Sequence, residues 1–235
     1  MLKYLQLQHR FDVEKMKAEA AQLDTLLWKQ HYNKSHYEGG WTVLPLRSIN
    51  GSLDNIVSVH ASAGTINYYE DTVLLSSCPY FQTVLSFFAC EKTAVRLMKL
   101  HAGAVIREHR DQEMSFEEGE VRFHIPVETN PGVEFYLDSE QIPLQEGECW
   151  YLNLSLKHHV HNTGATDRVH LVIDCKVNDW IKNLFAENAL LQKHVDCEQP
   201  PSHNEAAKRN IILELRNLNT PTSLALAEKM ENERP

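Results

Sequence analysis

The sequence lacks the features that mark exported and membrane-spanning chains. Its five cysteines are odd in number and form no Cys-x-x-Cys pair, so they indicate free thiols in a reducing compartment and neither a disulfide framework nor a zinc site. The first residues contain no apolar run of the signal-peptide kind, and no later apolar run is long enough to cross a bilayer. We therefore expect a cytoplasmic protein that does not associate with a membrane.

Positive charge is also scarce. The 23 lysines and arginines are outnumbered by 32 aspartates and glutamates, which gives a formal net charge of −9. This balance argues against a nucleic-acid backbone as a partner. A chain of 235 residues with 43% hydrophobic content is sufficient for one sizeable core. We predict one domain over residues 1–197, followed over 198–235 by a proline-containing linker and a C-terminal helical extension.

Short segments that alternate in polarity dominate the middle of the chain, and turn residues separate them about every ten positions. Helical spacing is confined to 13–26, 79–88 and 179–196, apart from the C-terminal extension. This pattern is typical of a sandwich or barrel. The predicted fold is mainly β with flanking helices, a cupin-like jelly roll. We expect its main strands at 41–48, 94–100, 121–127, 133–137, 149–154 and 167–175.

Two of these predicted strands carry polar residues at alternate positions. Arg122 and His124 share one face of their strand, and Arg168 and His170 share one face of theirs, because side chains of a strand point alternately to its two sides. The other face of each strand is apolar. Polar inward faces on separate strands suit a jelly roll whose mouth holds a small ligand.

A histidine and a carboxylate lie two residues apart at the end of another predicted strand. His109 and Asp111 can point the same way, and a distant cluster supplies a second imidazole from His158, His159 or His161. Two imidazoles and one carboxylate on one face of a metal are the ligand set of non-haem Fe(II) oxygenases. Spacing alone does not choose among the three distal histidines.

An arginine follows this cluster at the start of an apolar strand. Arg168 lies ten residues beyond His158, and a buried guanidinium beside a metal suits a carboxylate, which it can hold through two parallel hydrogen bonds. Residues 112–119 form a polar loop directly after the predicted ligands and are a candidate mobile lid. Within residues 28–52, which include the first main strand, His36 or Arg47 is a candidate to face the pocket.

Four stretches carry a resemblance to a known family. They are residues 100–111 (LHAGAVIREHRD), 121–130 (VRFHIPVETN), 147–153 (GECWYLN) and 158–174 (HHVHNTGATDRVHLVID). In this order they resemble the aspartyl/asparaginyl β-hydroxylase family of Fe(II)/2-oxoglutarate-dependent oxygenases. The resemblance extends from about Trp28 to Trp180, roughly two thirds of the chain. It implies a double-stranded β-helix with supporting helices.

The resemblance also implies a cofactor set and its ligands. The cofactors are Fe(II), 2-oxoglutarate as cosubstrate, and O₂. A histidine ten residues before the strand arginine is the usual iron ligand of the family, which selects His158 and leaves His159 as the runner-up. His109 and Asp111 match the other two ligands.

The remaining polar residues match positions that bind carboxylates in the family. Arg168 matches the arginine that binds the distal carboxylate of 2-oxoglutarate, and His170 occupies a position that helps to hold it. Arg122 and His124 match residues that contact the cosubstrate or the carboxylate of the substrate. Four arginines are candidates for that substrate carboxylate, with Arg122 first, followed by Arg47, Arg96 and Arg107.

The function implied is hydroxylation of an unactivated C–H bond, with release of succinate and CO₂. We expect an amino acid or an amino-acid-like small molecule as substrate, with a peptidyl Asp or Asn as an alternative. A jelly roll that binds a metal or ligand without turnover is the competing hypothesis. The sequence does not indicate an oligomeric state.

Overall fold

The computed structural model describes residues 2–23, 25–57, 68–111, 114–198 and 216, and side chains as far as 188 within the last helix. The chain divides into two units, Met1–Asn188 and Ala189–Pro235. The predicted linker and C-terminal helix fall almost entirely outside the described residues, so the domain boundary after 197 stays a prediction.

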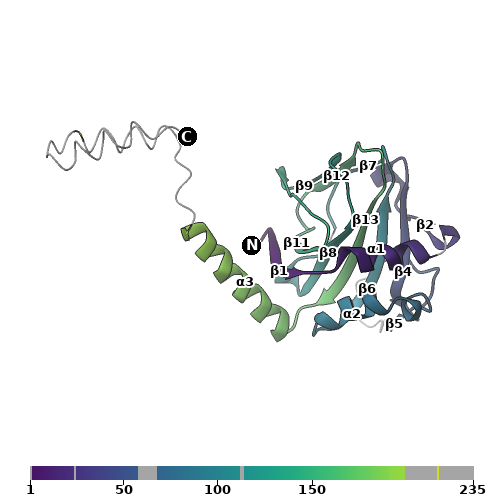
Figure 1. The fold of residues 1–235 in the computed structure, drawn as a ribbon, viewed down its shortest axis with the longest axis horizontal. Coiled ribbons are helices and arrows are strands. Elements are labelled where there is room, and N and C mark those ends of the chain that lie inside the picture. The colour runs from purple at the N-terminus through teal and green to yellow at the C-terminus, as the bar shows by residue number, and fades with distance from the viewer. Residues whose placement is uncertain (1, 24, 58–67, 112–113, 199–215, 217–235) are drawn as a thin grey trace. The chain divides into compact units, whose positions relative to one another are not determined.

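Two antiparallel sheets form the first unit (Figure 1). The larger sheet has the strand order β1-β11-β8-β13-β6-β4-β2, with β5 paired to β4, and the smaller has the order β10-β9-β12-β7-β3. Most neighbours in each sheet come from distant parts of the chain, as in a jelly roll. The predicted fold, mainly β with flanking helices, is confirmed.

The strands have the following bounds: β1 Tyr4–Arg10, β2 Lys29–Gln30, β3 Tyr37–Glu38, β4 Trp41–Ile49, β5 Tyr69–Asp71, β6 Lys92–Leu100, β7 Val105–His109, β8 Glu120–Glu128, β9 Val133–Leu137, β10 Glu140–Gln141, β11 Glu148–Leu152, β12 His158–Asn162 and β13 Arg168–Lys176. The α-helices are α1 Val13–Gln22, α2 Pro79–Phe87 and α3 Asp179–Glu198. Short 3₁₀ turns cover 25–27, 34–36, 75–77 and 116–118.

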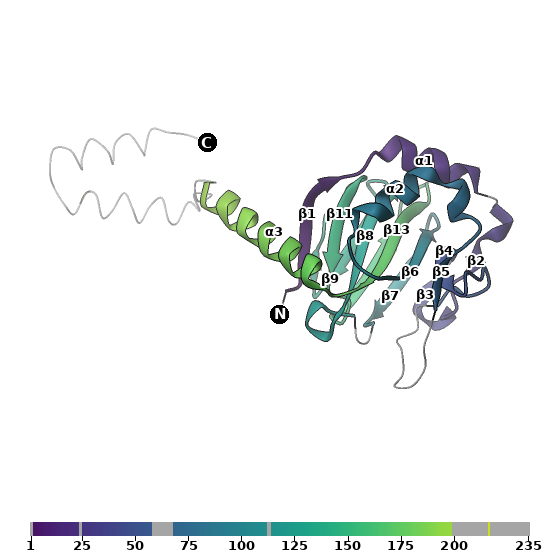
Figure 2. The ribbon, with the colours of Figure 1, turned by 90° about the horizontal axis from the view of Figure 1, so that it is seen from below.

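Helices α1 and α2 lie side by side against the outer face of the larger sheet (Figure 2). Asp12 caps α1 as predicted, because its carboxylate accepts a hydrogen bond from the backbone N–H of Lys15 at 3.2 Å. Glu19 of α1 in turn accepts the backbone N–H groups of Tyr80 and Phe81, at 2.5 and 2.8 Å. This buried carboxylate therefore joins the two helices.

The strands divide their side chains between two apolar clusters, as their alternation predicted. Phe123 of β8 and Leu171 of β13 belong to the cluster between the larger sheet and the helices. Met98, Phe135 and Trp150 belong to a second cluster between the two sheets. The polar residues of β8 and β13 share the parity of this second cluster, so they face the space between the sheets.

Two segments differ from expectation in detail. Residues 158–162 form a complete strand, β12, between β7 and β9, whereas the sequence analysis placed no main strand there. The second half of the predicted lid is packed: Met114 and Ser115 are buried, and the N–H of Phe116 donates to the hydroxyl of Tyr151 at 3.0 Å. Residues 112–113 of that loop lie outside the described residues.

Candidate metal and anion site

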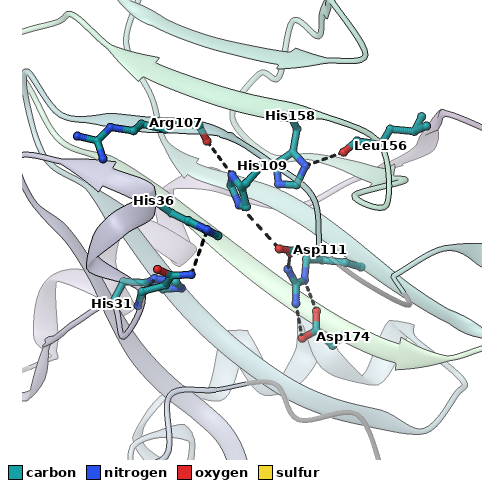
Figure 3. A network of polar contacts seen from close by, with 10 residues as sticks. His31, His36, Arg107, His109, Asp111, Leu156, His158 and Asp174 are labelled. Carbon is teal, nitrogen blue, oxygen red and sulfur yellow. Dashed lines mark hydrogen bonds and ion pairs between the residues drawn. The ribbon is translucent and has the colours of Figure 1, made fainter.

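Strands β7 and β12 bring two histidines face to face. His109 and His158 are register partners across this antiparallel pair, and their ring centroids lie 4.2 Å apart. Asp111 follows β7, and its backbone N–H donates to the carbonyl of Leu154 at 2.9 Å. One ligand atom from each of the three residues lies within 4.8 Å of the others (Figure 3). The structure thus brings together three residues predicted as ligands from two separate segments.

Both imidazoles are held by the nitrogen that faces away from this group. Nδ1 of His109 lies 2.8 Å from the carbonyl oxygen of Arg107, and Nδ1 of His158 lies 3.0 Å from that of Leu156 (Figure 3). A carbonyl oxygen only accepts, so Nδ1 carries the proton in each ring. Nε2 therefore keeps its lone pair for a metal, which is the usual arrangement of metal-binding histidines.

The neighbouring histidines of β12 lie elsewhere. The ring of His159 stacks on Tyr136 at 4.7 Å and lies 5.1 Å from that of His161. Alternation along β12 directs both side chains to the side opposite His158, and His158 is the buried one of the first two. The geometry therefore favours His158 over His159 as the distal ligand, although its metal-binding role stays a proposal.

The charges at this group suit a divalent cation. Burial lowers the pKa of His158 to about 4, so the ring is neutral near pH 7 and can donate its lone pair. Burial alone would raise the pKa of Asp111, but the positive charge of Arg122, with the neighbouring histidines, brings it below its usual value. The carboxylate is therefore ionised.

A chain of alternating charges lies behind the carboxylate. Arg122 donates from Nη1 to Oδ2 of Asp111 at 2.5 Å, and from Nε and Nη2 to the two oxygens of Asp174 at 2.5 and 3.0 Å. Arg96 donates from Nη2 to Oδ2 of Asp174 at 2.6 Å. Arg96, Arg122 and Asp174 are all buried. Each buried charge in this chain thus has an opposite charge beside it.

Arg168 lies on the same face of β13 as Asp174, but its charge is not balanced in the way that those of Arg96 and Arg122 are. Its side chain is 3% exposed, and among the described residues no carboxylate pairs with it. Among the described residues its hydrogen-bond contact runs from Nη2 to Nδ1 of His170 at 2.8 Å, and its Nε has no hydrogen-bond partner there. Burial lowers the pKa of Arg168 to about 9. A buried cation without a counter-ion is costly unless an anionic ligand joins it.

Two histidines between these groups also have unused ring nitrogens. His124 has no partner at either nitrogen in the described part of the chain, and His170 has none at Nε2. Burial lowers the pKa of both far below the usual value, so both are neutral. Buried polar atoms without partners are rare in folded proteins. Together with Arg168 they indicate a polar site for a ligand.

A cavity of about 860 Å³ gives access to Arg168 and His170. Its walls come mainly from the segments 129–135 and 141–146, and Phe135 of β9 is among the lining residues. The ring of Phe135 lies parallel to that of His158, with centroids 6.3 Å apart. The cavity therefore reaches Arg168 and His170, and one of its lining residues, Phe135, also lies beside His158.

The arginines predicted for a substrate carboxylate have other partners. Arg47 donates to Asp71 at 2.5 Å and to the carbonyls of Tyr69 and Lys92. Arg107 donates to the carboxylate of Glu38 at 2.7 Å and is half exposed. Neither structure nor charge therefore singles these two out as anion receptors.

Arg96 and Arg122 are both held by Asp174, so their assigned contact with a ligand stays a prediction. Of the two residues expected to face the pocket, His36 does lie at the site, with its ring 4.8 Å from that of His109 (Figure 3).

Sequence reasoning did not assign a role to Asp174. The residue has the same parity on β13 as Arg168 and His170, which was the available signal. An acidic residue inside an apolar strand, on a face that already carries polar side chains, is seldom buried without a partner. Its register partner on β8 is Arg122, and that pairing depends on tertiary structure.

A sequence model of the family described as aspartyl/asparaginyl beta-hydroxylase matches residues 10–177. The chain belongs to this family. The match contains all the strands of both sheets except β1, and with it every residue of the metal and anion groups described above.

One curated relative is the L-proline cis-4-hydroxylase of Rhizobium meliloti (strain 1021), with 25% identity over 167 residues. The alignment covers 70% of this chain and 58% of that protein.

Two solved structures align with this chain at lower similarity. A Pseudomonas putida prolyl-4-hydroxylase aligns with TM-score 0.47 and 12% identity, covering 74% of this chain and 92% of that one. A 2OG-Fe(II) oxygenase family oxidoreductase from Burkholderia pseudomallei aligns with TM-score 0.47 and 13% identity, covering 71% and 79%. The family assignment rests on the sequence match. In the described part of the chain, no helix combines the length and apolarity needed to span a membrane.

Proposed function

We propose that this protein is an Fe(II)/2-oxoglutarate-dependent hydroxylase of an amino-acid-like substrate. The observation that carries the proposal is the pairing of two groups on one inner surface. His109, Asp111 and His158 converge as a donor set, and Arg168 is a buried cation that no carboxylate neutralises among the described residues. A divalent metal and a carboxylate-bearing cosubstrate are the ligands that these two groups require.

The donor chemistry fits both ligands. Two imidazoles with free Nε2 lone pairs and one ionised carboxylate match the preference of Fe(II) for a two-histidine, one-carboxylate face. The unpartnered Nε of Arg168 matches one end of a dicarboxylate, which a guanidinium can hold with two parallel hydrogen bonds. When bound with O₂, iron and 2-oxoglutarate supply oxidation of a C–H bond with release of succinate and CO₂.

The residues of this chain would bind, orient and shield these ligands. His109, Asp111 and His158 hold the metal, while the backbone carbonyls behind the two rings fix their orientation. Arg168 and His170 hold the distal carboxylate of 2-oxoglutarate. The apolar cluster between the sheets keeps water away from the reacting centre.

Two further residues receive proposed contacts. His124, neutral and without a hydrogen-bond partner in the described structure, lies on β8, next to the strand that carries Arg168, and would contact the cosubstrate. Arg122 uses three N–H groups on Asp111 and Asp174, and a guanidinium has five. Its proposed contact with a ligand carboxylate would use the remaining two.

For the substrate we propose a free amino acid or a close analogue. The proline hydroxylase among the relatives supports this class over a protein substrate, and a peptidyl Asp or Asn remains the alternative within the family. The acidic net charge argues against a nucleic-acid partner, and a cytoplasmic location stays a prediction. A metal-binding jelly roll without turnover is the competing function.

The test is succinate formation from 2-oxoglutarate with Fe(II), ascorbate and O₂, with and without pooled amino acids that include proline, aspartate and asparagine. We expect succinate that rises with the pool and vanishes in His158→Ala. Slow succinate without stimulation would keep the oxygenase and point to a peptidyl substrate. No succinate, together with no binding of iron or 2-oxoglutarate, would refute the proposal and leave a binding module.

A further inference from the structure

One of the two carboxylate oxygens of Asp111 accepts a hydrogen bond from an arginine in the described structure, and the other does not. Oδ1 of Asp111 lies 3.7 Å from Nε2 of His109, whereas its Oδ2 accepts the hydrogen bond from Nη1 of Arg122. A metal held by Nε2 of the histidines would therefore meet Oδ1. Any change that frees Oδ2 would let the carboxylate turn.

The position of Arg122 is in turn set from behind by Asp174. The Nε and Nη2 edge of the guanidinium faces both oxygens of Asp174, which is the bidentate geometry that fixes a guanidinium plane most firmly. Asp174 is completely buried, so water does not compete for its oxygens. With this edge engaged, Nη1 is the nitrogen left to reach Asp111.

Asp174 is itself anchored on two sides. Arg96 on β6 donates to its Oδ2 at 2.6 Å, and the hydroxyl of Thr93 donates to its backbone carbonyl at 3.2 Å. Strands β6 and β8 flank β13 in the larger sheet. The carboxylate that holds Arg122 is thus fixed by the central strands, the most enclosed part of the sheet.

We propose that Asp174 is a positioning residue for the metal site: by clamping Arg122 against Oδ2 of Asp111, it presents Oδ1 alone to the metal. The proposal rests on the metal site of the proposed function. The carboxylate of Asp174 accepts hydrogen bonds from Arg96 and Arg122, so the proposed effect on Asp111 acts through Arg122. The negative charge of Asp174 also offsets the positive charge of the Arg122 guanidinium, which would otherwise repel a cation bound at Asp111.

The test measures metal affinity directly, with Co(II) titrated into the metal-free full-length protein and followed by its visible absorption. Asp174→Asn keeps the shape of the side chain and removes its charge. We expect Co(II) to bind roughly 10 to 100-fold more weakly, the usual effect of removing a group that orients a ligand. We also expect an altered absorption band shape, because a freed carboxylate can bind through both oxygens and change the coordination number.

A second variant and a control separate positioning from general damage. Arg122→Lys keeps the positive charge but cannot hold two carboxylates at once, so it should also weaken Co(II) binding. If Asp174→Asn does not fold, the Co(II) affinity of Arg122→Lys tests the positioning role instead. Glu19→Gln removes another buried carboxylate, which joins α1 to α2. It should lower the melting temperature and leave the Co(II) dissociation constant unchanged.

The outcomes distinguish two failures. Wild-type protein that binds no Co(II) would overturn the metal site and with it the proposed function. Wild-type protein that binds Co(II), with folded Asp174→Asn and Arg122→Lys variants of equal affinity and spectrum, would overturn the positioning role alone. A loss of affinity in Glu19→Gln as large as in Asp174→Asn would also overturn it, because destabilisation would then explain both.

Discussion

Replacement of Arg168 by methionine tests whether this residue serves to bind an anionic ligand or to stabilise the fold. Methionine has a similar length and no charge, so Arg168→Met removes the cation and leaves most of the buried volume filled. In the ligand-free protein the guanidinium is buried, has no carboxylate partner among the described residues and donates to His170. The charge should therefore destabilise the ligand-free fold.

The pKa shift sets the magnitude. Burial lowers the pKa of Arg168 from 12.5 to about 9, which corresponds to roughly 4 to 5 kcal/mol at about 1.4 kcal/mol per pKa unit. Loss of the hydrogen bond to His170 removes about 1 kcal/mol of stability, and water in the adjoining cavity reduces the burden of the charge further. A net gain of roughly 1 to 3 kcal/mol should remain, which raises the melting temperature of a unit this size by about 2 to 10 °C.

The assay is thermal unfolding with and without 2-oxoglutarate and Mn(II). Wild-type protein at a ligand concentration of about 100 times Kd should gain about 2.7 kcal/mol, and Arg168→Met should gain far less. The variant is thus expected to be the more stable protein without ligand and the less stabilised one with it. Ligand-free Arg168→Met that unfolds at a clearly lower temperature than wild type would refute the reasoning and give Arg168 a structural role.

Three further predictions concern the histidines and the carboxylate. His109→Ala and Asp111→Ala should each lose turnover and bind Co(II) at least about ten-fold more weakly, with an unchanged circular dichroism spectrum; wild-type turnover in either would remove it from the metal site. His158→Ala should lose Co(II) binding and His159→Ala should keep it, and the reverse titration result would move the ligand to His159. Burial lowers the pKa of His31 from 6.5 to about 3. As the pH falls below 6.5, His31 is therefore protonated in the unfolded chain while it stays neutral in the folded protein. Between pH 7 and pH 5 this difference should lower the free energy of unfolding by about 2 kcal/mol. Urea unfolding of metal-free His31→Phe should show a shallower decline over that range, and a slope equal to that of wild type would contradict this account.

The faces of the strands were predictable because they depend on local geometry alone. Alternation assigned Arg122 and His124 to the side of β8 opposite Phe123, and Arg168 and His170 to the side of β13 opposite Leu171, and the two apolar clusters confirm both assignments. A period of two is a property of any extended chain. The alternation of side chains between the two faces therefore does not depend on which strand lies next to it.

The partners of those side chains were not predictable from the same pattern. Whether Arg122 meets a ligand or a protein carboxylate depends on what lies across from it, and its register partner Asp174 is 52 residues away in sequence. The choice between His158 and His159 likewise depends on the register of β12 on β7. A shift of one residue would exchange the two histidines between the inside and the outside of the sheet.

The metal group and Arg168 lie on the polar surface between the two sheets, and the balance of charge differs around them. This difference indicates which of the proposed ligands suits each place. Near the metal group the carboxylates Asp111 and Asp174 offset the guanidiniums of Arg96 and Arg122, so a divalent cation enters a region that is neutral overall. Arg168 is left with one positive charge that no described carboxylate offsets. A bound metal would add positive charge to this surface, and the proposed dicarboxylate would offset it because it carries two negative charges. Binding of the metal should therefore strengthen binding of the dianion, and the reverse.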